Sequence, residues 1–456
     1  MRLLRSKRLS GGVFFTATKV ATIDVPIETL FTRDVLRVPL HARHNLSNSP
    51  DRSPETEMEL LAGAGDRIEA GDPLAQPPSG APAWARVFAP VSGIIGNRVT
   101  AGTARGAAAA VELMPSGDQA DISPSRTGSA EPSPNGLIDQ LAALGIGIDA
   151  DRCATDTQSA AGRPEWIIVD GLESAPYATA RTRTLIEHSG DLIDAARRLG
   201  GALGVSEVQF VVDRALGALV NTLRRHALGS RDDGGGQTRE TTVTVVPIPN
   251  QHPQCHPRML FRTVTGRELP PDRTPREAGA WIIGTCELLD IHRALVDGLP
   301  PVAQTLTVAG DAVQRLGNYR VPVGMSVEAI LLRVGLCRDP ARVVIGNALT
   351  GVAIRSADTI ITPDVEGIYV ASASAERDQT PGGCLRCGFC IDVCPVKIDP
   401  VGVFNAVELG HPSRVPSWVA RACLHCGLCD YVCPARLPLM RAVRHCRAHA
   451  GGGQYA

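Results

Sequence analysis

Two stretches near the C-terminus decide how this sequence is interpreted: residues 384–395 read CLRCGFCIDVCP, and residues 423–434 read CLHCGLCDYVCP. Each places four cysteines in the spacing C-x2-C-x2-C-x3-C, followed by proline. Three thiolates on such a turn can reach three irons of one [4Fe–4S] cubane, whereas the fourth lies too far along the chain and ligates the other cluster. Gly388 and Gly427 let the backbone curl close to the clusters. The sequence therefore predicts two clusters and electron transfer.

The expected ligands form two sets, each with three cysteines from one run and the fourth cysteine of the other. The first set is Cys384, Cys387, Cys390 and Cys433, and the second is Cys423, Cys426, Cys429 and Cys394. Structural zinc normally uses two C-x2-C pairs instead. Disulfides would need an oxidising compartment, and no secretory signal is visible. The other five cysteines are expected to be small buried side chains: Cys153, Cys255, Cys286, Cys337 and Cys446.

Length and charge narrow the class of protein further. A chain of 456 residues should form three or more domains. Its 46 basic and 47 acidic residues nearly balance, which argues against a nucleic acid as partner. No stretch approaches the roughly 18 apolar residues of a spanning helix, so no transmembrane segment is expected. Reduced thiols fit a cytoplasmic protein.

The N-terminal region, residues 1–125, is expected to hold a small β-structure. Residues 1–50 read as extended and irregular. Short apolar runs with turn formers at 66–74 and 89–95 are typical of a β-sandwich and resemble the halves of a barrel-sandwich hybrid. Carrier versions of that fold present a lysine between the halves, but residues 76–88 contain none. A docking or scaffold module is the expectation.

Residues 136–300 alternate apolar strands with amphipathic helices. Strands are predicted at 166–170, 208–213 and 242–248, and helices at 180–199, 214–228 and 258–265. This alternation indicates a Rossmann-like domain with a largely parallel sheet.

Two smaller units complete the chain. Residues 301–370 are predicted to form a β-grasp module, with strands at 305–308, 319–323, 342–345 and 359–361 and a helix at 327–334. Residues 380–450 carry the clusters, with helices predicted at 401–409, 417–422 and 439–449. The 28 residues between Cys394 and Cys423 exceed what a minimal bacterial ferredoxin uses, which favours a helical two-cluster domain. The fold class is multidomain α/β plus β.

In this order the domains resemble the C subunit of the Rnf electron-transport complex and its relative, the microcompartment cobalamin reductase. The segments that carry the resemblance, besides the cysteine runs, are residues 11–13, 65–75, 89–93, 169–177, 265–270, 307–311 and 317–324. The resemblance implies a soluble-ligand-binding β-grasp and an iron–sulfur subunit of a membrane-associated redox complex. It implies membrane-embedded partner subunits and a place on the cytoplasmic face of the inner membrane.

The chain departs from that family where the family holds flavin and nucleotide. The family loop G-x-G-G-A-G-F-P-T is replaced at residues 144–155, where two glycines remain and Asp149 and Asp151 put negative charge near a phosphate position. The next family motif, N-x-x-E-C-E-P-Y with a later aspartate, keeps Glu173 and Tyr177 but loses the cysteine, the second glutamate and the aspartate. These losses argue against bound FMN and NADH, because a flavin site needs close backbone approach.

Three functions stay open: an electron-transfer subunit, a complete NADH- and FMN-dependent reductase, and a non-catalytic assembly protein. The segment from Asn250 to His256 contains His252, Cys255 and His256, without a spaced fourth metal ligand, so a loop with incidental histidines is expected. Four arginines near the second run could serve an acidic ferredoxin or flavodoxin partner or form solvated surface: Arg421, Arg436, Arg441 and Arg444.

Overall fold

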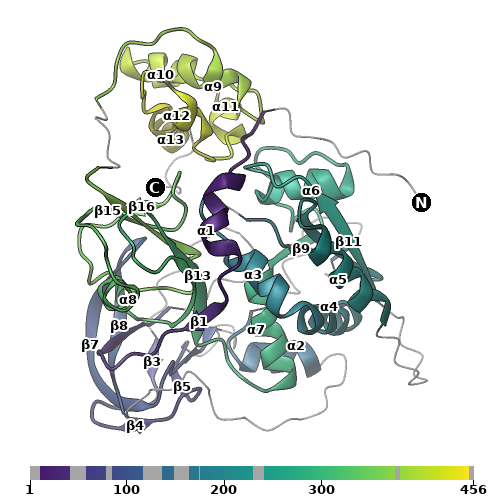
Figure 1. Ribbon diagram of the computed structural model, residues 1–456, viewed down its shortest axis with the longest axis vertical. Helices are drawn as coiled ribbons and strands as arrows, with labels where there is room; N and C mark the ends of the chain where they lie inside the picture. Colours follow the sequence, from purple (N-terminus) through teal and green to yellow (C-terminus); the bar gives the residue numbers. More distant parts are fainter. Residues whose placement is uncertain are drawn as a thin grey trace.

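The computed structural model describes residues 11–41, 58–78, 85–116, 136–147, 164–173, 175–229, 241–374 and 380–450. Within these ranges the strands form four sheets, of six, four, four and three strands. Figure 1 shows the C-terminal helices at one end of the molecule, above two larger groups of strands and helices. The protein is a multidomain α/β chain, as its length predicts.

The first α/β unit is built on a parallel sheet in the order β11-β10-β9-β12. Its strands are β9 (Trp166–Asp170), β10 (Glu207–Asp213), β11 (Thr242–Ile248) and β12 (Ala280–Gly284). Its helices are α2 (Gly136–Ala143), α3 (Ala180–Glu187), α4 (Ser189–Leu203), α5 (Gly217–Gly229), α6 (Pro257–Thr265) and α7 (Thr285–Val296). The three predicted strands are confirmed, and β12 was not predicted.

Both faces of this sheet are covered, which is why its strands are apolar throughout. Ile167 and Val169 of β9 lie in one core with Leu199 of α4. Ile168, which points to the other face, packs with Phe261 of α6. β10 lies on one side of β9 and β12 on the other, so the strand order reverses there. Open parallel sheets bind ligands at the carboxyl ends of the strands beside such a switch point.

The second unit is a mixed sheet in the order β1-β14-β13-β17-β15-β16. Its strands are β1 (Ile27–Thr29), β13 (Ala303–Ala309), β14 (Gly317–Pro322), β15 (Pro340–Ile345), β16 (Val352–Ala353) and β17 (Gly367–Ser372). Helix α8 (Val327–Val334) begins after Ser326, whose hydroxyl accepts a hydrogen bond from the N–H of Ala329 at 3.1 Å. This cap explains why the predicted helix starts where it does.

Two smaller sheets lie beside the mixed sheet, in the orders β2-β8-β7-β4 and β3-β5-β6. Their strands are β2 (Leu36–Pro39), β3 (Glu59–Leu60), β4 (Arg67–Ile68), β5 (Pro73–Gln76), β6 (Val87–Phe88), β7 (Gly93–Thr103) and β8 (Gly106–Pro115). Leu74 and Ile95 are fully buried in a core that also contains Val321 of β14. The two small sheets and the mixed sheet therefore share one core.

Three sequence expectations were wrong in detail. Residues 11–41 are not irregular: they contain a 3-10 turn at Thr16–Lys19, helix α1 (Val20–Ile23) and strands β1 and β2. Residues 359–361 form no strand, because the N–H groups of Ile360 and Ile361 bond to two different neighbours, the carbonyls of Gly102 and Met325. Helix α5 begins at Gly217, because Asp213 first closes a turn.

The C-terminal domain is helical, as predicted. Its helices are α9 (Phe389–Asp392), α10 (Pro400–Glu408), α11 (Ser417–Ala422), α12 (Leu428–Val432) and α13 (Leu439–Ala450), with a 3-10 turn at Pro412–Arg414. A core of Val403, Ala420, Val443 and Cys446 joins α10, α11 and α13. Among the helices in the described ranges, none has the length and apolarity needed to cross a membrane.

Candidate iron–sulfur centres

The two cysteine runs fold into the same backbone path twice. Short helices α9 and α12 each follow a left-handed glycine, Gly388 with φ of 80° and Gly427 with φ of 77°. Two residues before each glycine the backbone is left-handed again, at Arg386 with φ of 54° and His425 with φ of 52°. Paired left-handed positions bend the chain around a space and turn peptide N–H groups toward it. Each run therefore makes a cradle.

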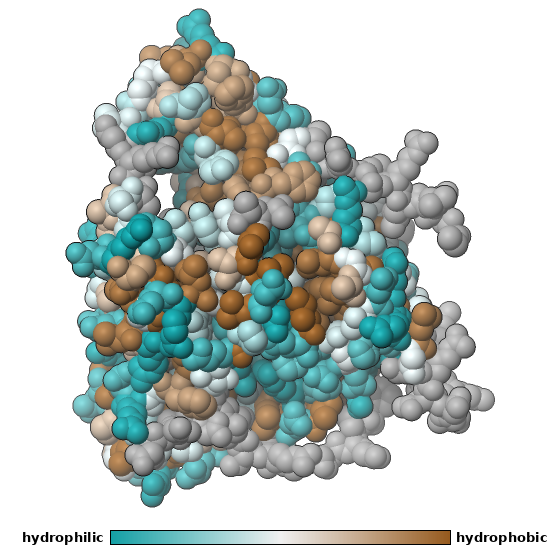
Figure 2. Space-filling view, viewed as in Figure 1, coloured by the Kyte–Doolittle hydropathy of each residue, from teal (hydrophilic) through white to brown (hydrophobic). Residues whose placement is uncertain are grey.

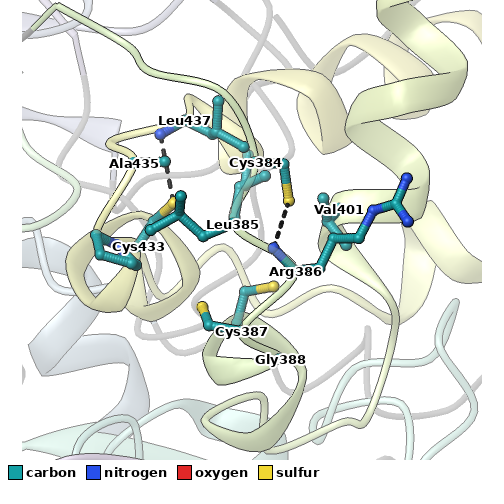
Figure 3. A pocket seen from close by; sticks show the side chains of 12 residues that line it. Cys384, Leu385, Arg386, Cys387, Gly388, Val401, Cys433, Ala435 and Leu437 are labelled. Carbon is teal, nitrogen blue, oxygen red and sulfur yellow. Dashed lines mark hydrogen bonds between the residues drawn. The ribbon is translucent and has the colours of Figure 1, made fainter.

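The first cradle closes around a pocket that Figure 3 shows. Four of the residues that line it are cysteines: Cys384, Cys387, Cys390 and Cys433. Three come from the first run, and the fourth is the last cysteine of the second run. Apolar side chains, including Leu437 and Leu439, complete the wall. The pocket thus collects the four thiols that the spacing assigns to one centre.

The other four cysteines form a second group. The thiols of Cys423 and Cys426 both interact with that of Cys394, and Cys429 interacts with Cys423 and Cys426. Burial raises the pKa of the Cys426 thiol to about 12, and the neighbouring thiols Cys423 and Cys394 add to the shift. Crowded thiols oppose each other's ionisation, and a metal centre supplies the missing positive charge. This donor set fits a cluster.

Peptide N–H groups point at the sulfurs in both cradles. Arg386 N lies 3.4 Å from Cys384 Sγ, and the equivalent His425 N lies 3.4 Å from Cys423 Sγ. Leu437 N lies 3.5 Å from Cys433 Sγ. Such bonds stabilise thiolates and help to set the reduction potential of a cluster.

The described residues contain no three His, Cys, Asp or Glu side chains arranged to hold a single metal ion. A cubane does not require that arrangement, because each of its four irons takes one thiolate at a separate corner. The two groups of cysteines are also neighbours: Cys429 of the second packs in one cluster of side chains with Cys390 and Cys433 of the first. The geometry fits two adjacent cubanes.

The two groups differ in how they meet the solvent. Cys384 and Cys387 of the first group are exposed. The side chains beside them, Leu385 and Phe389, are 68% and 54% exposed. Figure 2 shows hydrophobic surface on this end of the molecule. No cysteine of the second group is exposed. The first group therefore faces outward.

The second group is covered by parts of the chain far away in sequence. His252 Nε2 lies 2.9 Å from the carbonyl oxygen of Cys426, and the His252 backbone bonds to Val13 in both directions. Phe15 packs edge-on against Tyr431, with ring centroids 5.3 Å apart. The N–H of Gly12 bonds to the carbonyl of Val393 at 2.9 Å. The N-terminal segment and the loop after β11 thus attach the second cradle to the parallel sheet.

The interpretation of the histidines in that loop as incidental was therefore incomplete. His252 contacts a peptide of the second cradle, 174 residues away, which no local pattern indicates. His256 caps helix α6 through its Nδ1, which accepts from the N–H of Arg258 at 3.2 Å. Burial lowers the pKa of His256 to about 3, and the positive charge of Arg258 adds to the effect.

The remaining cysteines and the altered glycine loop lie elsewhere. Cys446 is buried as expected, but Cys337 is exposed, with its Sγ near two backbone carbonyls. Gly145 is left-handed, and a Cβ there would lie 2.9 Å from a ring carbon of Phe88. Cys153, Asp149 and Asp151 fall outside the described residues.

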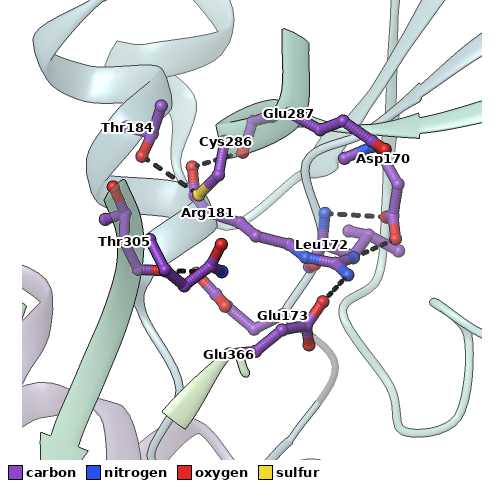
Figure 4. Close-up of polar contacts among 12 residues, drawn as sticks. Asp170, Leu172, Glu173, Arg181, Thr184, Cys286, Glu287, Thr305 and Glu366 are labelled. Atoms are coloured by element: carbon purple, nitrogen blue, oxygen red, sulfur yellow. Dashed lines mark hydrogen bonds and ion pairs between the residues drawn. The ribbon is translucent and has the colours of Figure 1, made fainter. Parts of the chain in front are cut away.

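The motif at residues 170–177 lies at the carboxyl end of β9, at the switch point (Figure 4). Asp170, its first residue, is nearly buried and paired with Arg181 of α3. Burial raises the pKa of Asp170 to about 6, although Arg181 acts in the opposite direction. Arg181 was not among the predicted site residues, although it lies only four residues after Tyr177, the last residue of the motif.

Two family models match this chain. The model described as Nuo51 FMN-binding domain covers residues 150–293, and the model described as 4Fe-4S dicluster domain covers residues 383–438. The second match spans both cysteine runs, and the first spans the parallel sheet.

Curated relatives match nearly the whole chain. The C subunit of the ion-translocating oxidoreductase complex of Rhodobacter capsulatus is 25% identical over 418 residues, which cover 89% of this chain and 76% of that protein. The C subunit of the proton-translocating ferredoxin:NAD(+) oxidoreductase complex of Clostridium ljungdahlii is 24% identical over 86% of this chain and 83% of its own length. Among solved structures, an NAD+-reducing [NiFe]-hydrogenase matches 61% of this chain and 53% of its own, with 12% identity and a TM-score of 0.47.

Proposed function

Because this chain belongs to the family formed by the C subunits of ion-translocating oxidoreductase (Rnf) complexes, we propose that it relays electrons through two [4Fe–4S] clusters within a membrane-associated redox complex. The eight cysteines of the two runs are the proposed ligands, in the sets Cys384, Cys387, Cys390, Cys433 and Cys423, Cys426, Cys429, Cys394. When bound, the clusters supply one-electron chemistry, and the protein sets their positions and potentials.

One observation supports the proposal: Cys433 lines the same pocket as Cys384, Cys387 and Cys390, and Cys394 acts on the thiols of Cys423 and Cys426. A zinc-stapled fold has no need of such an exchange, because each run could close its own site. Crossed runs instead keep the two centres adjacent, which a relay requires.

Exposure gives the relay an order. The first centre faces solvent through Cys384 and Cys387, so it is the proposed point of exchange with a partner. The proposed second centre is covered by the N-terminal segment, through Phe15, and by the loop after β11, through His252. We propose that electrons pass between the solvent-facing first centre and the inward-facing second centre, either inward or outward.

The other modules are proposed to dock partners. We assign residues 1–125 to an N-terminal region with a barrel-sandwich hybrid, 136–300 to a Rossmann-like domain, 301–370 to a β-grasp module and 380–450 to the cluster domain. Strands β13, β14, β15 and β17 around α8 support the β-grasp assignment. The partners are other subunits of the complex, at the cytoplasmic face of the membrane, and a ferredoxin or flavodoxin.

Two alternatives compete with the relay. The FMN-binding family model favours a complete NADH- and FMN-dependent reductase. In a non-catalytic assembly protein, the clusters would only stabilise the fold and would not transfer electrons. Reversible reduction of both centres in a redox titration supports the relay against the assembly protein, and flavin content decides between the relay and the reductase.

Iron analysis of paired cysteine variants, purified without oxygen, tests the crossed ligand sets. We expect about eight irons in the unmodified chain and about four in Cys384→Ala or Cys394→Ala. The double variant Cys384→Ala/Cys433→Ala should also keep about four, because both residues serve one centre. Cys384→Ala/Cys394→Ala should lose both centres.

Cys446→Ala is the matched control, since this cysteine is buried in the same domain but lies outside both cradles. It should keep all the iron. If Cys384→Ala/Cys394→Ala retained one full centre while Cys384→Ala/Cys433→Ala lost both, each run would hold its own cluster and the crossed sets would be wrong. An iron content far below eight per unmodified chain would contradict the proposed relay.

A further inference from the structure

We propose that the crevice at the switch point of the parallel sheet is filled by the protein's own charged side chains, and that this chain binds neither flavin nor nucleotide there. The crevice lies between the carboxyl ends of β9 and β12, at Asp170 and Gly284. In sheets of this topology that is where a cofactor is held. This inference does not depend on the proposed relay.

The side chain of Arg181 extends to Asp170, at the end of β9, and to Glu366 (Figure 4). One guanidinium nitrogen donates to Asp170 Oδ2 and the other to Glu366 Oε1. A Cβ placed on Gly284 would lie 4.0 Å from the guanidinium carbon. Burial alone would lower the pKa of Arg181, but the carboxylates of Glu366 and Asp170 raise it well above its ordinary value. The cation is held firmly in place.

At the start of the helix that follows β9, three N–H groups that a phosphate could use already have internal acceptors. Both Thr179 and Ala180 donate their N–H to the hydroxyl of Thr307 at 3.0 Å. The N–H of Thr182 donates to Glu173 Oε1 at 2.7 Å. Helix N-termini bind phosphate through these groups. Here an internal carboxylate and a hydroxyl from β13 take that place.

The start of the helix that follows β12 also makes internal hydrogen bonds. The N–H of Gly284 donates to Glu287 Oε2 at 3.3 Å. The hydroxyl of Thr285, the first residue of α7, donates to the backbone carbonyl of Arg181 at 3.0 Å. Both helix N-termini at the switch point therefore carry a carboxylate of the protein itself.

Charge and shape oppose a phosphate-bearing ligand as well. Asp170, Glu173 and Glu366 bring three carboxyl groups to the crevice, and Arg181 and Lys19, the cations beside them, already interact with these groups and not with a ligand. Gly171, which follows β9, leaves no room for a ligand: a Cβ there would lie 2.5 Å from Leu185 Cδ1 and 2.8 Å from the carbonyl oxygen of Val211. The glycine serves internal packing. The residues present do not fit FMN.

The filled crevice joins separate sheets. Arg181 links β9, through Asp170, to Glu366, the residue before β17 of the mixed sheet. Beside it, Asn318 Oδ1 of β14 accepts from the hydroxyls of Thr179 and Thr307, each at 2.9 Å. We therefore assign these residues a structural role: they hold the two sheets in a fixed relation.

Flavin binding by the intact, cluster-loaded chain tests the first half of the inference. The protein is dialysed against FMN, and released flavin and iron are measured on the same sample. At about 10 µM FMN we expect fewer than about 0.1 flavins per chain, which corresponds to a Kd weaker than about 0.1 mM. One flavin per chain would overturn the inference. Iron content is read separately, so loss of the clusters would count against the relay and not against the filled crevice.

A double-variant cycle tests the second half. Arg181→Gln and Glu366→Gln should each lower the thermal midpoint, and the double variant should fall no further than the larger single effect, because the two side chains form one contact. Arg198→Gln breaks the exposed pair with Asp194 and should change the midpoint little. If the decreases in thermal midpoint caused by Arg181→Gln and Glu366→Gln were additive, the proposed contact between the two sheets would be contradicted. If Arg181→Gln fails to fold, Glu366→Lys, which places two cations together, must lower the midpoint more than Glu366→Gln.

Discussion

Gly388 and Gly427 occupy equivalent places in the two cradles but have different surroundings. Both are left-handed, which costs a residue with a Cβ about 1 to 2 kcal/mol. A Cβ on Gly388 meets no atom within 4 Å, whereas one on Gly427 lies 3.0 Å from Thr350 and 3.1 Å from Leu349. We expect Gly388→Ala to lower the thermal midpoint slightly and Gly427→Ala to lower it more and release iron. Equal effects would contradict the role of the neighbouring loop.

Asp170 makes stability depend on pH in a direction that its environment fixes. Its folded pKa of about 6 lies above the ordinary value of 3.8 because the group is buried. The folded protein keeps a proton that the unfolded chain has released, so stability contributed by this group falls as pH rises from about 4 to 6. The full loss is about 3 kcal/mol, from the shift of roughly two units. Asp170→Asn removes this slope.

Thermal midpoints of the two proteins, compared from pH 5 to pH 7, measure that effect. The difference in favour of Asp170→Asn should grow with pH over this interval. A constant difference would mean that Asp170 stays ionised throughout, with Arg181 outweighing burial. The slope is the relevant quantity, because losing the contact with Arg181 adds an offset that does not change with pH.

At the scale of elements, the loop after β11 holds the peptide backbone of the second centre in place. His252 Nε2 bonds to the peptide of Cys426, and a hydrogen bond of this kind contributes about 1 kcal/mol. We expect His252→Phe, which keeps an aromatic ring, to speed the loss of iron from the second centre about fivefold. The rate of chelation by a ferrous chelator, followed in a Cys384→Ala background, isolates that centre.

His411→Phe provides the control, because His411 is an exposed histidine of the cluster domain itself. Its rate of iron loss should equal that of the unmodified background. A His252→Phe protein that released iron no faster than His411→Phe would show that the loop after β11 does not protect the second centre.

The sequence predicted elements well where a local pattern determines them. Buried strands of a parallel sheet are continuous apolar runs, so β9, β10 and β11 were recognisable. The crossed cysteine sets stay a prediction, which rests on chain reach, because a tight turn cannot bring its own fourth thiol back. Contacts across long separations left no such pattern. The parallel pairing of β1 with β14 and the reach of Glu366 to Arg181 depend on how whole sheets meet.

At the scale of the whole molecule, the two centres differ in exposure, so a partner is expected to exchange electrons at the first centre. Cys384 and Cys387 are exposed, and the exposed cation Arg386 lies between them in the chain. The net charge of the chain is only -1, so the whole chain adds little long-range repulsion to the local attraction of Arg386. An acidic partner would be steered to this face and would reach the first centre before the second.

Small charged oxidants can test this steering without knowledge of the partner. In a stopped-flow experiment, the reduced chain should transfer electrons to the anion ferricyanide faster at low salt than at high salt, and Arg386→Glu should slow the reaction about tenfold at low salt. Arg224→Glu, an exposed position on α5 of the parallel-sheet domain, carries the same charge change and should leave the rate unaltered. If both variants slowed the reaction equally, the rate would depend only on the net charge of the chain. Steering by the face of the first centre requires that the two variants differ, and that the difference vanish when salt screens the charges.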